Sequence, residues 1–146
     1  MPRRICVDAC VVVKLVLAES NSREAELLWR EWTNSQVDLI APTLLIFEGA
    51  SAIRLNVTRR FITQEVADLA FRGFIAEVQN IRLLFSDDLH ERAWQIAKHQ
   101  NQSQVYDAYY LALAESFGCE FWTADDRLYN SVQTVFPWVK HITRFG

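Results

Sequence analysis

The chain has 146 residues, of which 51% are hydrophobic, so it can bury the core of one folded domain and is not a disordered chain. We therefore expect a single domain over residues 1–146. The formal net charge of −3 excludes the strongly basic balance that binds nucleic acid through bulk charge, so such binding would need a local basic patch.

Short apolar runs alternate with helical periodicity along the whole chain. In chain order, the patterns predict strand 3–7, helix 11–18, helix 23–32, strand 37–41, helix 43–57, helix 63–78, strand 81–85, helix 87–99, helix 105–117, strand 119–122, helix 126–130 and strand 138–142. Thr63 and the Ser20-Asn21-Ser22 segment are expected to cap helices, and Gly118 is expected to end one. The alternation predicts an α/β fold with a parallel sheet covered on both faces.

Two of the predicted strands lead directly into carboxylates. Asp8 follows the first strand, and Asp125 follows the fourth after Thr123 and Ala124. Ligands of α/β sheets bind beyond the carboxyl ends of the strands, so both aspartates are candidates for a site at this edge. Each is also suited to cap the helix that follows it, and Asp126 could exchange roles with Asp125.

Two further carboxylates are predicted to lie on apolar helix faces. Leu44 and Ala52 flank Glu48 at i−4 and i+4, and Tyr110 follows Asp107 at i+3. A buried, unpaired carboxylate is costly, so each of these acids needs a partner such as a cation.

Each of the two also has an alternative interpretation. Glu48 could form a salt bridge with Arg54 or Arg82. A negative charge in the first turn of a helix, where Asp107 lies, is favourable without any ligand.

Asp8, Glu48, Asp107 and Asp125 together predict one acidic cluster at the sheet edge. Such a cluster repels itself unless cations neutralise it. Oxygen ligands without histidine suit a hard cation, Mg²⁺ or Mn²⁺. Because such an ion lowers the pKa of bound water and neutralises a phosphoryl group, the residues favour metal-dependent phosphodiester hydrolysis.

Four segments resemble, in order, the motifs of the PIN-domain ribonucleases, and in particular of the VapC toxins of bacterial toxin–antitoxin pairs. They are Val7-Asp8-Ala9-Cys10 with Lys14, Ala41-Pro42 through Glu48, Tyr106-Asp107-Ala108 through Leu111-Ala112-Leu113-Ala114-Glu115, and Thr123-Ala124-Asp125. The segments span nearly the whole chain. In one departure, Cys10 stands where the family usually has serine, and a thiol is a poorer hydrogen-bond partner than a hydroxyl.

The resemblance implies a five-stranded parallel sheet in a three-layer α/β/α sandwich, and cleavage of RNA by a metal-dependent endoribonuclease. It implies that Asp8 and Asp107 are the main ligands of Mg²⁺ or Mn²⁺. Glu48 and Asp125 would complete the catalytic cluster, and Thr123 would brace it by hydrogen bonding. It also implies a homodimer and a cognate antitoxin that covers the active site.

Cysteine usage and hydropathy bear on the compartment. Cys6, Cys10 and Cys119 are an odd number of cysteines in apolar segments, which indicates reduced thiols and a cytoplasmic protein. No uncharged apolar run approaches the length of a membrane span, so we expect no membrane association. No histidine lies near Cys10 in the sequence, so we do not expect it to be a nucleophile.

Two further groups of residues have alternative interpretations. Trp29 and Trp32 share a helix face that is either core or part of a groove for an antitoxin helix. Several arginines could form a phosphate-binding rim, although two of them also suit a solvated helix end. The candidates for the rim are Arg3, Arg4, Arg54, Arg59, Arg60 and Arg127, with Arg59 and Arg60 at the helix end.

Two other functions remain open from the sequence. One is a catalytically silent PIN-like module that binds RNA or a partner. The other is a phosphoacceptor domain, which usually has paired acids after its first strand, whereas Asp8 stands alone there. With only four glycines, the chain contains no glycine-rich phosphate loop, which argues against P-loop and dinucleotide-binding folds.

Overall fold

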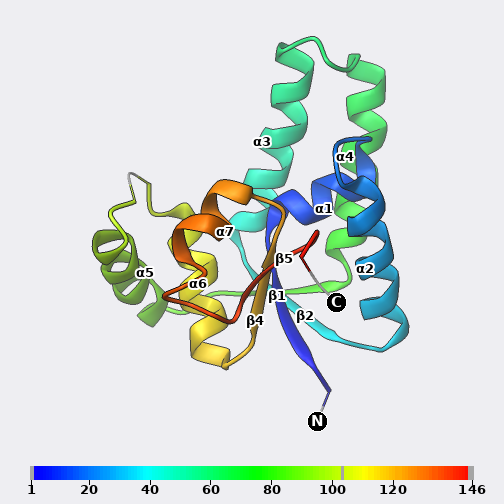
Figure 1. Cartoon of the computed structure of the whole chain (residues 1–146). Helices are drawn as coiled ribbons and strands as arrows, with labels where there is room; N and C mark the ends of the chain where they lie inside the picture. Colours follow the sequence, from blue (N-terminus) through cyan, green and yellow to red (C-terminus); the bar gives the residue numbers. More distant parts are fainter. Residues whose placement is uncertain (1, 103, 145–146) are drawn as a thin grey trace.

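A computed structural model describes residues 2–102 and 104–144 of the chain. Within these ranges, seven helices surround a parallel sheet of five strands, as expected (Figure 1). The elements are β1 (Arg4–Val7), α1 (Ala9–Val16), α2 (Ser22–Asn34), β2 (Asp38–Pro42), α3 (Leu44–Thr58), α4 (Gln64–Val78), β3 (Ile81–Leu84), α5 (Asp88–His99), α6 (Tyr106–Phe117), β4 (Glu120–Thr123), α7 (Asp126–Val132) and β5 (Val139–His141).

The strand order places β1 at the centre of the sheet. The order is β3-β2-β1-β4-β5, and every neighbouring pair is parallel. The chain builds outward from β1 through β2 to β3, and then returns to the other side of β1 with β4. Ligand sites of α/β proteins lie where the strand order reverses in this way, beyond the carboxyl ends of the strands. In this sheet that position lies between the ends of β1 and β4.

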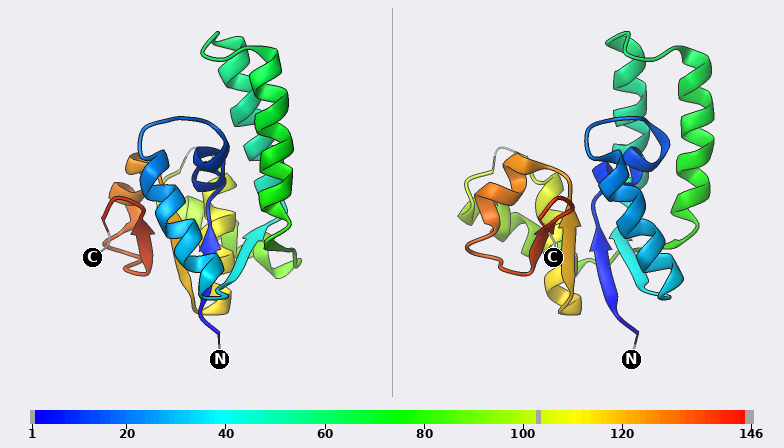
Figure 2. Two further views of the ribbon diagram at one scale, coloured as in Figure 1. Left: turned by 90° about the vertical axis from the view of Figure 1, so that its right-hand side faces the viewer. Right: turned by 45° about the vertical axis from the view of Figure 1, so that its right-hand side comes forward.

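Helices cover both faces of the sheet and form a three-layer α/β/α sandwich (Figure 2). On one face α6 packs against β1, β2 and β4, and α5 packs against α6. On the other face α1 packs against α2, α3 and α4, and the indole of Trp32 in α2 lies 5.5 Å from that of Trp122 in β4. Half of the side chains of α6 are buried, including the run from Tyr110 to Ala114, which explains its largely apolar sequence.

The α3–α4 pair extends beyond the end of the sheet (Figure 1). The two helices approach closely at Gly49, where an added Cβ would lie 2.0 Å from Cζ of the buried Phe74 ring. Since only glycine leaves room for this ring, the sequence at Gly49 fixes how α3 packs on α4. It thereby positions Glu48, the preceding residue.

Several local predictions can now be compared with the structure. Thr63 accepts a hydrogen bond from the Val66 N–H at 3.2 Å, and Gly118 ends α6 with φ = 61°, so both predicted helix ends are confirmed. The expected cap before the second helix is wrong. Asn21 is the N-cap residue but its side chain caps nothing, and Ser22 Oγ bonds the Glu19 N–H and the Leu17 carbonyl instead.

The groove interpretation of the two tryptophans is also wrong. Trp29 is 6% exposed and Trp32 is 1% exposed, so both belong to the core. The indole N–H of Trp29 donates to a Glu77 carboxylate oxygen at 2.8 Å, which provides the polar partner that a buried tryptophan needs. No helix among the described residues is both long enough and apolar enough to cross a membrane.

Candidate active site

The ends of β1 and β4 are joined through the Thr123 hydroxyl. This hydroxyl donates to Oδ2 of Asp8 at 2.8 Å and accepts from the backbone N–H of Asp125 at 3.0 Å. The Asp8 N–H in turn donates to the Trp122 carbonyl at 3.0 Å. Thr123 is fully buried, so its hydroxyl fixes the position of the Asp8 carboxylate relative to the turn after β4.

Asp8 is buried at the start of α1. It occupies the N-cap position as predicted, but its carboxylate is bonded by the Thr123 hydroxyl and makes no side-chain capping hydrogen bond. Its pKa is raised to about 6, chiefly because burial disfavours the charged form. The hydrogen bond from Thr123 lowers the pKa, and the negative charge of Glu48 raises it. A cation bound next to Asp8 would stabilise the charged form of this buried carboxylate.

Glu48 has a tyrosine as its partner, and the alternative of a salt bridge is wrong. The Tyr110 hydroxyl donates to Oε1 of Glu48 at 2.6 Å. Arg54 bonds Gln64, and Arg82 bonds Asp38. Burial raises the pKa of the Glu48 carboxyl, and the charge of Asp107 raises it further.

Tyr110 is a member of the site that sequence reasoning missed. It is fully buried in α6, one turn after Asp107, and its ring packs 5.5 Å from that of Phe121. A tyrosine on a buried helix stripe needs a hydrogen-bond partner for its hydroxyl, and that requirement was the available signal.

Asp107 projects from the first turn of α6 toward the same edge. Its pKa is raised to about 7, first by burial and then by the charges of Asp8 and Asp125. Because Glu48 is also coupled to Asp8 and to Asp107, these four residues form one electrostatic unit, which we call the acidic cluster. The structure thus brings together the acids that the sequence pattern selected.

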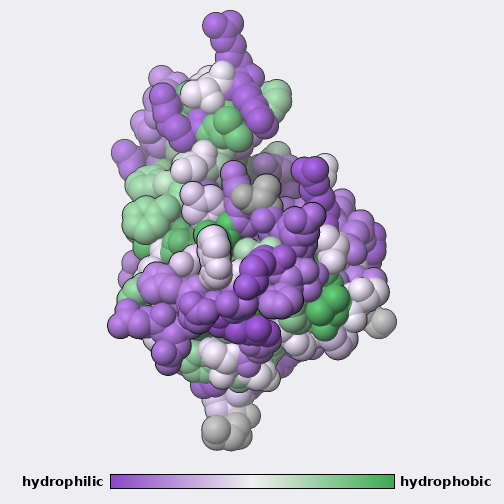
Figure 3. Space-filling model, turned by 90° about the vertical axis from the view of Figure 1, so that its left-hand side faces the viewer, coloured by the Kyte–Doolittle hydropathy of each residue, from purple (hydrophilic) through white to green (hydrophobic). Residues whose placement is uncertain are grey.

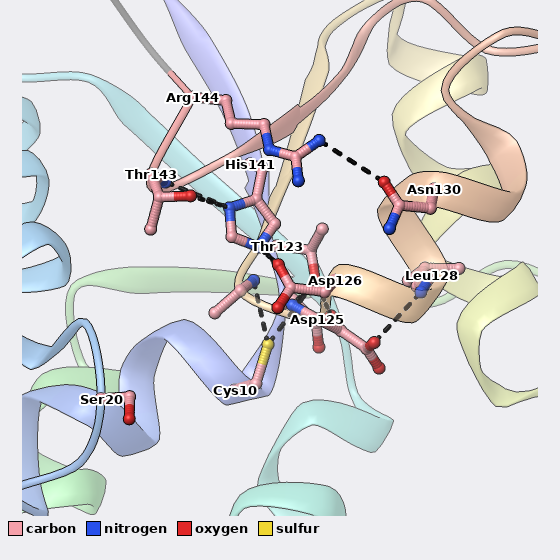
Figure 4. A network of polar contacts seen from close by, with 12 residues as sticks. Cys10, Ser20, Thr123, Asp125, Asp126, Leu128, Asn130, His141, Thr143 and Arg144 are labelled. Carbon is pink, nitrogen blue, oxygen red and sulfur yellow. Dashed lines mark hydrogen bonds and ion pairs between the residues drawn. The ribbon is translucent and has the colours of Figure 1, made fainter.

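The two aspartates after β4 point to different neighbours (Figure 4). Asp125 Oδ1 accepts from the Leu128 N–H at 3.0 Å, so it does cap α7, while its charge reaches Asp107. Asp126 Oδ1 instead lies 2.9 Å from Nε2 of the buried His141 in β5, in a close but poorly aligned contact. Asp125 is therefore the acid of this pair that faces the cluster. It caps α7 and contributes its charge to the cluster at the same time.

Cys10 occupies a structural position beside the cluster. Its Sγ accepts from the Ala124 N–H at 3.3 Å and lies 3.6 Å from Oγ1 of Thr123 (Figure 4). Burial and the charge of Asp8 raise the pKa of the thiol well above its ordinary value. Since the thiolate is the nucleophile, this environment does not activate Cys10.

The prediction that the six arginines form one phosphate-binding rim is wrong. Arg3 pairs with Glu120 and Arg4 pairs with Asp38, and all four residues lie at the amino ends of strands, on the edge opposite the acidic cluster. Arg127, at the start of α7, lies close to the cluster and lines a cavity with Asp107 and Asp125.

The donor set fits a hydrated divalent ion. Among the described residues, no group of three or more His, Cys, Asp or Glu side chains forms a ready-made metal cage. Within the same ranges, no lysine or arginine forms an ion pair with the four acids of the cluster. Mg²⁺ commonly takes one or two protein carboxylates and keeps several waters, so coupled acids without a protein cation suit it.

The sequence model of the PIN domain family matches residues 5–132. This chain therefore belongs to the PIN domain family, as the four segments predicted. Among curated proteins, no sequence matches the chain significantly. The family assignment overturns the phosphoacceptor alternative. Consistent with this, Asp87 after β3 is the N-cap residue of α5, and its charge does not contribute to the raised pKa values of Asp8, Glu48 or Asp107.

Solved structures of low sequence identity share the fold. The crystal structure of PAE2754 from Pyrobaculum aerophilum has a TM-score of 0.68 at 19% identity, covering 97% of this chain and 85% of that one. A toxin–antitoxin complex from Klebsiella pneumoniae has a TM-score of 0.62 at 15% identity, covering 92% and 94%. VapC20 of Mycobacterium tuberculosis, described as a sarcin-ricin loop cleaving toxin, has a TM-score of 0.64 at 19% identity, covering 87% and 94%.

Proposed function

We propose that this protein is a Mg²⁺- or Mn²⁺-dependent endoribonuclease that acts as the toxin of a toxin–antitoxin pair. The observation that carries the proposal is the convergence of Asp8, Glu48, Asp107 and Asp125 on one sheet edge from four separate elements. Carboxylates that repel one another at this cost to stability are typical of a functional site rather than of a structural one.

In this proposal Asp8 and Asp107 hold the metal. A bound Mg²⁺ or Mn²⁺ would supply a lowered pKa for water and would neutralise the charge of a phosphodiester. Thr123 keeps the Asp8 carboxylate oriented, because its hydroxyl donates to Oδ2. Tyr110 restrains Glu48 in the same way, so Glu48 can orient a water molecule and accept its proton beside the phosphodiester. Asp125 adds negative charge opposite Asp107.

The comparisons support RNA as the substrate and an antitoxin as the partner. VapC20 is named as a toxin that cleaves the sarcin-ricin loop, and the Klebsiella pneumoniae structure is named as a toxin–antitoxin complex. Neither exceeds 19% identity, so they support the proposal through the shared fold and the family motifs. The same proposal includes a cytoplasmic location, where RNA and reduced thiols coexist.

An apolar groove beside Glu48 offers a place for the antitoxin. It has a volume of about 510 Å³ and lies between α3 and the start of α6. Its lining consists of Leu44, Phe47, Glu48, Ser51, Ala52, Leu55 and Tyr106. Phe47 is 71% exposed, and Figure 3 shows apolar surface below the α3–α4 projection, above a broad hydrophilic face. An amphipathic antitoxin helix placed here would cover the acidic cluster from one side.

The α3–α4 projection carries further exposed apolar side chains, which supports a homodimer as part of the proposal. Phe61, Val66, Leu69 and Phe71 are each between 42% and 71% exposed. Several exposed apolar side chains on one projecting part of a protein are common at protein–protein interfaces. The molar mass of the purified protein in solution, measured by light scattering, tests this part, since the chain alone has a mass of 17.0 kDa.

Cleavage of a structured RNA by the purified, partner-free protein tests the activity. The reactions contain EDTA, Mg²⁺ or Mn²⁺, and compare wild type with Asp8→Asn and Asp107→Asn, which keep the side-chain shape. Asp68→Asn, on the exposed surface of α4, is the matched control. We expect cleavage that needs the metal, is lost in the two cluster variants and persists in the control. Cleavage that survives both cluster variants would contradict the proposal.

A protein that binds RNA or a partner at any divalent metal concentration but cuts nothing would be the catalytically silent module. Binding is measured in the same preparations by fluorescence anisotropy of labelled RNA, so the two functions are separated by one set of samples.

A further inference from the structure

A polar cavity lies next to the acidic cluster, between the turn that follows α5 and the start of α7. Its volume is about 400 Å³, which is within the range of pockets that hold small ligands. Asp107 and Asp125 form one wall, so whatever enters the cavity lies beside the proposed catalytic acids. The remaining lining residues are Gln100, Asn101, Gln102, Gln104, Arg127, Leu128 and Ser131.

The chemistry of the opposite wall is unusual for a protein surface. Four primary amides face the cavity together with one guanidinium, that of Arg127, which is the only cation among the described lining residues. Amides present donors and acceptors at once, whereas lysine or carboxylate side chains present only one kind. A wall of this composition suits a ligand that itself carries alternating donors and acceptors.

These polar groups are not used inside the protein. Within the described residues, no hydrogen bond or ion pair engages the side chains of Gln100, Asn101, Gln104 or Arg127. Gln102 carries a carbonyl oxygen, Oε1, that is buried without a partner in the same part of the chain. Buried polar atoms are nearly always satisfied, so the Gln102 amide would gain a hydrogen-bond partner if its side chain turned toward the cavity.

The backbone beneath the amides is anchored. The N–H groups of Gln100 and Gln102 donate to the Ile96 and Ala97 carbonyls, each at 2.9 Å, at the end of α5. Asn101 between them has φ = 52°, a left-handed conformation that asparagine tolerates and that closes the turn. The amide side chains therefore project from a turn whose backbone is hydrogen-bonded to the end of α5.

We propose that this cavity is a nucleotide subsite that receives one unpaired base of the RNA, next to the phosphodiester to be cut. This inference rests on the proposed function and adds to it, because it assigns the selection of a base to the turn at residues 100–102. Asparagine and glutamine amides pair with the donor and acceptor atoms of base edges, and Arg127 is placed to contact a neighbouring phosphate. A base already paired in a duplex has its Watson–Crick edge occupied, so the subsite takes single-stranded or looped RNA.

Sequencing of the ends cut from a randomised single-stranded RNA library tests the proposal. Wild type is compared with Gln102→Leu and Asn101→Ala, and the matched control is Gln79→Leu, at the exposed C-cap of α4 on the opposite side of the sheet. We expect wild type and the control to prefer one base at one position beside the cut. Gln102→Leu should weaken that preference by about tenfold or more, since a well-formed amide–base pair discriminates by that order.

Arg127→Ala provides the contrasting result, because a phosphate contact carries no sequence information. We expect it to raise KM and to leave the base preference unchanged. Melting temperatures of all variants verify that they fold. An unchanged preference in folded Gln102→Leu and Asn101→Ala, with cutting still dependent on the metal, overturns the subsite and leaves the nuclease proposal intact.

If the wild-type protein cuts no RNA, the nuclease proposal fails, and a second measurement is needed to test the subsite by itself. The four nucleoside 5′-monophosphates are titrated into ¹⁵N-labelled protein and followed by NMR. Base-dependent shifts of the Asn101 and Gln102 side-chain amides that need more nucleotide in Arg127→Ala, and that weaken in Gln104→Leu, support the subsite. Shifts that are absent, or equal for all four bases, overturn it.

Discussion

The hydroxyl of Thr123 donates a 2.8 Å hydrogen bond to Oδ2 of Asp8, a residue 115 positions away in the chain. Two neighbouring parallel strands, β1 and β4, bring this pair together at their carboxyl ends. The same hydroxyl accepts from the Asp125 N–H. One buried side chain therefore ties a proposed metal ligand to the turn that carries another acid of the cluster.

Thr123→Val should impair catalysis through this bond. Valine keeps the shape of threonine but removes the hydroxyl, so Asp8 loses a hydrogen bond that lowers its pKa. A hydrogen bond to a charged group contributes about 1.5–3 kcal/mol, so we expect kcat/KM to fall by roughly 10- to 100-fold. Thr123→Ser retains the hydroxyl and is the control. Equal activity of the Val and Ser variants would show that the bond has no role.

Asp107→Asn should stabilise the metal-free protein while abolishing cleavage. The folded-state pKa of Asp107 is about 7, against an ordinary value of 3.8. Between these values the folded state binds more protons than the unfolded state, so the free energy of unfolding falls as pH rises. At pH 7.5 the variant avoids this cost, and we expect a gain of about 1–2 kcal/mol after allowing for solvent screening.

Urea unfolding in EDTA at pH 4.5 and pH 7.5 measures this gain. The difference between variant and wild type should be small at the lower pH and larger at the higher one. Asp68→Asn, on the exposed surface of α4, should show no such dependence. A variant that is less stable than wild type at pH 7.5 would mean that the Asp107 carboxylate is favourably paired in the folded chain.

The binding of Mn²⁺ should strengthen as pH rises from 5.5 to 7.5. The pKa of Asp8 is raised to about 6 and that of Asp107 to about 7, so both carboxyls hold protons at the lower pH. A cation must displace these protons, and its apparent affinity rises as they are lost. Titration followed by electron paramagnetic resonance of free Mn²⁺ measures this directly, without reference to cleavage. An affinity that does not change over this range would place the ion elsewhere.

The sequence was informative where periodicity and strand order determine position. Asp8 and Asp125 follow strands that a parallel sheet must align, so their approach could be predicted from the alternation of strands and helices. The partner of Glu48 could not be predicted in this way. Tyr110 was assigned only to the apolar stripe, because a pattern shows which face a tyrosine occupies but not which group its hydroxyl reaches.

The positions of the arginines could not be predicted from the sequence either. Arg3 and Arg4 are close to Asp8 in sequence, yet a strand of four residues, Arg4–Val7, carries them to the opposite edge of the sheet. The amides at residues 100–102 lie between two predicted helices, and the sequence could not show that this turn shares a cavity with Asp125.

Cys10→Ser should leave activity within about threefold of wild type, or raise it slightly. Cys10 Sγ accepts from the Ala124 N–H, and a serine hydroxyl is a stronger acceptor at the same position. The thiol is buried with a raised pKa and takes no part in the proposed chemistry. Steady-state cleavage by the two proteins at saturating Mn²⁺ makes the comparison. Complete loss of activity in a folded serine variant would support a nucleophilic role for the cysteine instead.

Gly49→Ala should destabilise the fold and weaken the site together. The new methyl group would lie 2.0 Å from Cζ of Phe74, so α3 must move away from α4 or the ring must leave its place in the core. Overpacking of this kind costs about 1–3 kcal/mol. Glu48 precedes Gly49 and moves with it, so we expect lower cleavage even where the variant remains folded. Gly49→Ala combined with Phe74→Leu, which shortens the opposing side chain, should recover part of both losses. Failure of the double variant to regain any stability would mean that the helices are not held apart by this contact.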